Sequence, residues 1–146
     1  MKFLISVTFI LLSACASTTY LSEFNPIGTV KVTNHLKTGS TSIQRANVFD
    51  TCSGEWGRKS TALFGETAEH LASANESNLF LISQTPAIED ANCRFVVELS
   101  LNDKDIINLT LMQDETGTCT LSGDTAKISI KENLPSDIND YFVCKL

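Results

Sequence analysis

The sequence lacks the motifs by which most enzymes are recognised. It contains no glycine-rich phosphate loop, no paired-histidine zinc motif and no nucleophilic serine elbow. Its only two histidines are His35 and His70, and none of its five cysteines is spaced as a C-x-x-C pair, so we do not expect a zinc site. We therefore predict a protein that is not an enzyme and that needs no metal and no cofactor.

Positive charge is also scarce. The chain carries 11 Lys and Arg against 17 Asp and Glu, a formal net charge of −6. Five acids and five bases lie between Cys15 and Asn75, whereas twelve acids and five bases follow from Glu76 onward. An acidic protein offers no counter-charge to a phosphate backbone, so nucleic acid is excluded as a partner.

No hydrophobic run is long enough to span a bilayer, and the longest lies at the N-terminus. After Lys2 comes the apolar run from Phe3 to Leu12, which has the length of a signal-peptide core and ends in Ser13-Ala14-Cys15. Two small residues before a cysteine resemble the lipobox of bacterial lipoprotein precursors. The resemblance implies that Cys15 is diacylglyceryl-modified and becomes the mature N-terminus. The alternatives are an ordinary secretory signal with an incidental Cys15, or a buried core helix.

This reading divides the chain into a signal peptide (1–14), a short polar tether (15–26) and one domain (27–146). About 130 residues can build a hydrophobic core. Because Ala16 is not the aspartate that resembles an inner-membrane retention signal, we expect anchoring in the outer membrane, with the domain facing the periplasm or the cell surface.

Four cysteines remain once Cys15 is assigned to lipid: Cys52, Cys93, Cys119 and Cys144. Beyond a signal peptide they meet an oxidising compartment, so we expect two disulfides. Four cysteines can pair in three ways, and the simplest choice joins Cys52 to Cys93 and Cys119 to Cys144.

The expected fold class is α+β, an antiparallel meander sheet covered by one helix. The spacing of Phe64, Ala68, Leu71 and Ala72 predicts a helix over residues 60–75. Alternating or continuous apolar runs predict strands at 28–33, 46–52, 79–82, 93–101, 107–111, 118–122, 126–131 and 141–146, with a loop at 35–42 and a turn at 53–58.

The order of strand, Cys52, helix and then Ala74-Asn75 leading into a strand and a further cysteine is similar to small disulfide-bonded outer-membrane lipoproteins of the Rcs stress-sensor kind. That resemblance covers about forty residues and implies an envelope location. It carries no functional residue across, and the meander that follows is an addition.

The candidate binding residues are turn acids and the only tryptophan: Asp103, Asp105, Asp114, Glu115, Asp124 and Trp56. The acids lack the ligand order and central glycine of a calcium loop, so we expect solvated hairpin turns that could form two rims. Trp56 is expected to cover the core or to serve as a binding platform. Two functions follow: a structural or interaction lipoprotein that contacts a basic protein, or a periplasmic inhibitor or immunity protein that blocks a cationic enzyme or toxin.

Overall fold

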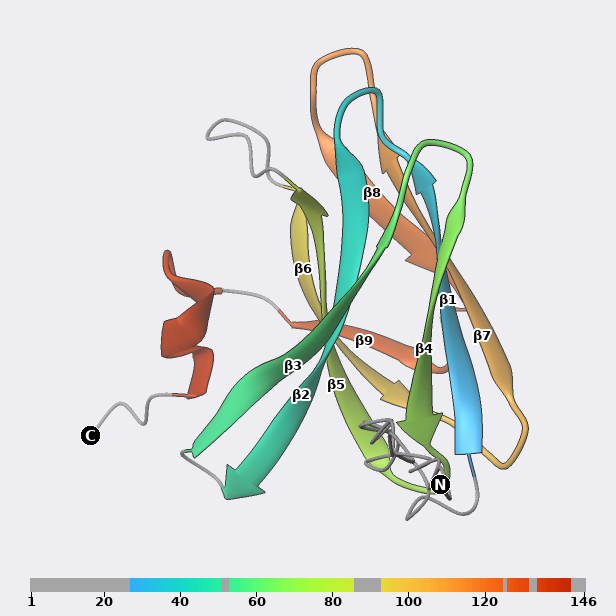
Figure 1. Ribbon diagram of the computed structural model, residues 1–146, viewed down its shortest axis with the longest axis vertical. Coiled ribbons are helices and arrows are strands. Elements are labelled where there is room, and N and C mark those ends of the chain that lie inside the picture. The colour runs from blue at the N-terminus through green and yellow to red at the C-terminus, as the bar shows by residue number, and fades with distance from the viewer. Residues whose placement is uncertain (1–26, 51–52, 86–92, 125, 132–133, 143–146) are drawn as a thin grey trace, which may run out of the picture.

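The computed structural model describes residues 27–50, 53–85, 93–124, 126–131 and 134–142, and these form two β-sheets packed face to face (Figure 1). The first sheet has the strand order β4-β1-β7-β8. Its strands are β4 (Thr67–Ser73), β1 (Ile27–His35), β7 (Ile106–Gln113) and β8 (Cys119–Gly123). β1 pairs antiparallel with β4 and parallel with β7, so this sheet is mixed.

The second sheet has the order β3-β2-β5-β6-β9 and is antiparallel throughout. Its strands are β3 (Ser53–Ala62), β2 (Ser40–Asp50), β5 (Ser77–Thr85), β6 (Arg94–Ser100) and β9 (Ile128–Lys131). A single 3-10 turn, η1 (Ile138–Phe142), follows and lies beside β3.

The core lies between the two sheets. Successive side chains of a strand point to opposite faces of its sheet, so one set of side chains from each sheet faces this core. In β1, every second residue is buried. The largest fully buried side chains are Val30, Val32, Leu36, Ile43, Phe80, Ile82, Val96, Val97, Leu99, Ile107, Leu109 and Leu111. Among the described residues no helix is long and apolar enough to cross a membrane.

The predicted helix over residues 60–75 is wrong, and with it the α+β fold class. These residues form the end of β3, a tight turn and β4, and the described part of the chain contains no α-helix. Ala68 and Ala72 are four residues apart, and residues with this spacing lie on the same face of a helix and also on the same face of a strand. Gly65 has a φ of +76°, which suits a hairpin turn and not a helix interior. The resemblance to stress-sensor lipoproteins rested on this helix and loses its basis.

The predicted single meander is also wrong, although strands do occur near the four expected segments from residue 93 to residue 131. β6 and β9 belong to one sheet and β7 and β8 to the other, so the chain crosses between the layers twice from β6 to β9 alone. Of the expected loop at 35–42, residues 36–39 do connect β1 to β2, whereas 35 and 40–42 belong to these strands. The expected turn at 53–58 lies within β3, which pairs with β2. Of the expected last strand, residues 141 and 142 belong to η1, and 143–146 lie outside the described residues.

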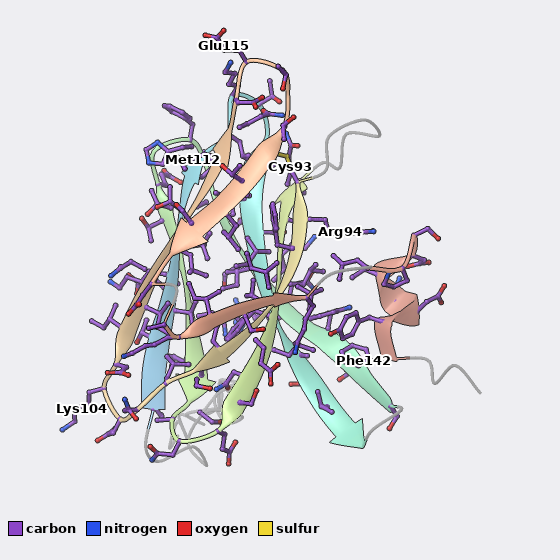
Figure 2. The ribbon with its side chains drawn as sticks, turned by 180° about the vertical axis from the view of Figure 1, so that it is seen from behind. Cys93, Arg94, Lys104, Met112, Glu115 and Phe142 are labelled. Carbon is purple, nitrogen blue, oxygen red and sulfur yellow. A yellow bond between two sulfur atoms is a disulfide. The ribbon has the colours of Figure 1, made fainter. Side chains whose placement is uncertain are left out.

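Within the described residues there is one disulfide, between Cys93 and Cys119, with a Cα–Cα distance of 5.0 Å. The predicted pairings of Cys93 with Cys52 and of Cys119 with Cys144 are therefore wrong. Cys93 immediately precedes β6 and Cys119 begins β8, so this bond joins the two sheets at one end of the sandwich (Figure 2). Cys52 and Cys144 lie outside the described residues, as do Cys15, the signal peptide and the tether.

Candidate functional site

The predicted acidic residues do not form one patch. The turn that holds Asp103 and Asp105 precedes β7, and the hairpin that holds Asp114 and Glu115 follows it. These turns therefore lie at opposite ends of the molecule, as the labels on Lys104 and Glu115 show (Figure 2).

Two of the acidic turn residues, Asp105 and Asp124, accept hydrogen bonds from backbone N–H groups of the turns in which they lie. Asp105 Oδ2 accepts hydrogen bonds from the Asn102 backbone N–H (2.9 Å) and from Lys127 Nζ (2.7 Å). The bond from Lys127 is the main reason that the pKa of Asp105 lies below its usual value. Asp124 Oδ1 accepts the Ala126 N–H at 3.2 Å.

Asp114 likewise acts within the β7–β8 hairpin. Its Oδ1 accepts bonds from the Thr116 hydroxyl (2.7 Å), the Thr116 N–H (2.8 Å) and the Thr118 N–H (2.9 Å). The bond from the Thr116 hydroxyl contributes most to lowering the pKa of Asp114. Asp103 and Glu115 are exposed and make no ion pair or hydrogen bond with the rest of the described chain. They are the turn acids most available to a partner.

Trp56 is half-buried beneath η1 and the residues that lead into it. Its Nε1–H donates to the carbonyl of Ile138 at 3.1 Å, and its ring centroid lies 5.1 Å from that of Phe142 and 5.7 Å from that of Tyr141. Figure 2 shows Phe142 projecting from this turn toward the strands. Burial is the main reason that the pKa of Tyr141 is raised, and Lys131 opposes the shift.

Arg94, on β6, holds the same C-terminal segment at its other end. Its guanidinium donates to the carbonyls of Pro135 (2.7 Å) and Ser136 (3.0 Å). The segment therefore crosses the outer face of the second sheet between two anchor points.

A groove of about 300 Å³ lies beside Trp56, and we call it the Trp56 groove. Within the described residues its lining combines apolar and polar side chains and no basic one: Gln44, Gly54, Glu55, Trp56, Leu81, Ile138, Asn139 and Phe142. A second groove of about 420 Å³, next to Asn75 and Lys127, is lined mainly by turn residues.

The most exposed apolar side chains lie at the β3–β4 turn, which the sequence did not identify as a site. Leu63 and Phe64 are 64% and 68% exposed. We call this pair the Leu63–Phe64 tip. The turn is closed by two bonds, from the Glu66 N–H to the Leu63 carbonyl (2.9 Å) and from the Leu63 N–H to Glu66 Oε2 (3.0 Å).

Hydrogen bonds from a fully buried asparagine, Asn34, hold the tip in place. Asn34 Nδ2 donates to the Ala62 carbonyl at 3.0 Å, and its Oδ1 accepts the Leu36 N–H at 2.8 Å. Its backbone bonds the turn as well: the Gly65 N–H donates to the Asn34 carbonyl (2.8 Å), and the Asn34 N–H donates to the Glu66 carbonyl (3.0 Å). The tip is therefore held rigidly while its side chains stay in solvent.

The tip adjoins further apolar surface. The His35 ring meets the Phe64 ring edge-on at 6.1 Å, and His35 lies beside Met112, which is 40% exposed, in the parallel β1–β7 register. Figure 1 shows that the β1–β2, β3–β4 and β7–β8 connections all emerge at this end. Asp114 and Glu115 therefore lie at the same end of the molecule as the tip.

No cluster of three or more His, Cys, Asp or Glu side chains that could hold a metal ion occurs in the described part of the chain. No protein-family model matches the sequence, and no curated protein matches it. The surfaces described above are therefore the features of the molecule that bear on its function.

Proposed function

We propose that this protein is a non-catalytic, lipid-anchored protein of the bacterial envelope that binds another protein through its Leu63–Phe64 tip. The observation that carries the proposal is a rigid turn with two adjacent large apolar side chains in solvent. Hot spots of protein interfaces are commonly a few large side chains that fill pockets on the partner. Because the tip is already ordered by Asn34, little conformational entropy is lost when it binds.

The direction of the chain supports this role. β1 begins at Ile27, next to the tether, and ends at His35, next to the tip. Nine strand residues span roughly 30 Å. A lipid on Cys15 would hold the domain by its Ile27 end, since residues 16–26 reach at most about 40 Å. The tip would then point away from the membrane that holds the anchor.

The acids at that end indicate the partner's chemistry. Asp114 and Glu115 on the neighbouring hairpin favour a partner whose apolar pocket has a basic rim. Such a contact is steered by charge and should weaken with salt.

The anchor gives the first testable prediction. Mass spectrometry of the mature protein should find residue 15 as an acylated N-terminal cysteine, and Cys15→Ser should leave the precursor uncut while the domain still folds. An unmodified N-terminus at any other residue would contradict the lipid anchor.

The Leu63–Phe64 tip gives the second testable prediction. Leu63→Ser combined with Phe64→Ser should weaken capture of the envelope partner by at least about 30-fold, the effect of losing one good hot spot. Stability should change little, because both side chains are exposed.

The matched control is Ile106→Ser, which removes a side chain that is 58% exposed near the opposite end of β7. It should retain the same partner with unchanged affinity. Equal loss with this control and with the tip variant would show that the tip has no special role.

A further inference from the structure

We infer that the Trp56 groove binds a cationic side chain, arginine or lysine, presented by a protein. The inference deepens the proposed function, on which it rests for the source of the ligand, by naming the chemistry of a second contact. Trp56 lies on β3 seven residues before Leu63, which follows the end of that strand, a span of roughly 23 Å, so the groove is separate from the Leu63–Phe64 tip.

The polar atoms of the groove include open acceptors. Gln44 Nε2 donates to the Gly57 carbonyl at 3.0 Å, and Asn139 Nδ2 donates to Asp137 Oδ1 at 2.9 Å. Both partners are acceptors, so the amide nitrogens must face them and the amide oxygens, Gln44 Oε1 and Asn139 Oδ1, stay open. Each amide nitrogen keeps a second N–H, so these side chains offer a ligand both acceptors and donors, and the preference for a cation comes from the Glu55 carboxylate and the aromatic rings.

Glu55 adds a carboxylate to the same lining. It is exposed, and its one side-chain bond in the described structure is a long one from Asn47 Nδ2 at 3.4 Å. Two amide oxygens and a carboxylate together favour a ligand that carries several N–H donors and a positive charge.

The aromatic side of the groove favours the same ligand. The rings of Trp56 and Phe142 both line it. A guanidinium or ammonium group is attracted to an aromatic face, and tryptophan is the strongest partner. The apolar stem of such a side chain can pack against Leu81.

Size and local charge limit the occupant. A volume of about 300 Å³ is at the small end for ligand sites, which suits one side chain and not a large cofactor. Two cations that contact the C-terminal segment or the end of β9 are already engaged, since Arg94 donates to two carbonyls and Lys131 is ion-paired with Glu98.

The test uses Trp56, the only tryptophan in the chain, as its own reporter. N-acetyl-L-argininamide is titrated into the full chain in detergent while tryptophan fluorescence is recorded. We expect the fluorescence change to saturate, with half of the full change at about 1–10 mM argininamide, as is typical of a single exposed cation–π and hydrogen-bonded contact. N-acetyl-L-citrullinamide, which has a similar shape but no charge, should bind at least tenfold more weakly.

Two variants of equal charge locate the effect. Glu55→Gln should weaken argininamide binding about fivefold or more, by loss of a charge-assisted contact. Glu115→Gln, at the far end of the molecule, should leave it unchanged. The tip variant should also bind argininamide normally, so failure of the tip proposal and failure of this one are distinguishable.

Several results would overturn the inference. The first is that argininamide does not saturate the fluorescence change up to 100-fold above the expected range. The second is that the citrulline analogue binds as well as argininamide. The third is that Glu55→Gln and Glu115→Gln weaken argininamide binding equally, or that neither weakens it. Saturation by N-acetylglucosamine without saturation by argininamide would assign the groove to a saccharide instead.

Discussion

Phe80→Ala is expected to lower the free energy of unfolding by about 3–5 kcal/mol, the usual cost of removing a fully buried phenylalanine. Phe80 is 0% exposed at the centre of the sandwich, and the His70 ring packs edge-on against it at 5.6 Å. Urea denaturation followed by tryptophan fluorescence measures the change.

Phe64→Ala is the matched control, since it makes the same chemical change in a side chain that is 68% exposed. We expect a change within about 0.5 kcal/mol. The pair also tests the fold, because a helix over residues 60–75 would put Phe64 in the core. Equally large losses for both variants would contradict the two-sheet structure.

Replacing both Cys93 and Cys119 by alanine is expected to cost up to about 3.5 kcal/mol, from the chain-entropy cost of a loop of this size. The two cysteines are 26 residues apart, and their side chains are 3% and 7% exposed. Because the bond joins the two sheets, its loss should also loosen that end of the sandwich. Denaturant unfolding of the double variant gives the magnitude.

Peptide mapping of the unreduced protein checks the connectivity on which this prediction rests. It should recover the peptides that contain Cys93 and Cys119 as one linked species. A Cys93 peptide linked to Cys52 would contradict the structure. The oxidation of Cys52 and Cys144 stays a prediction, and the same map will report on it.

The sequence was most informative where alternation was clean. In β7 and in β6 with the residue that follows it, every second residue from Ile107 to Leu111 and from Val97 to Leu101 is apolar, and these residues are buried as expected. Alternation shows which face of a strand is buried but not which sheet the strand joins. Hence the strands near residues 93–131 were located, whereas their division between two layers was not.

The helix error has a definite cause. Two of the three apolar residues of β4 are alanines four residues apart, a spacing that fits both a helix and a strand, and Phe64 lies four residues before Ala68 and so extends the pattern. In the structure Phe64 belongs to the turn and faces solvent. The tip was missed for the same reason, because a side chain assigned to a core is not considered for binding. The one available signal was Gly65, a residue suited to a turn.

The parallel pairing of β1 with β7 bears on how the chain acquires its structure. Thr29 lies opposite Ile106. The β1–β7 pairing therefore forms only after β7 has been synthesised, long after β1. Contacts so distant in sequence slow folding, typically to milliseconds or seconds. A chain synthesised from its N-terminus thus exposes β1 early while one of its two neighbouring strands is still missing. For the exported, lipid-anchored protein that we propose, slow closure of this kind would keep the polypeptide extended long enough to be threaded through a translocation channel, and completion of the fold on the far side would then oppose its return.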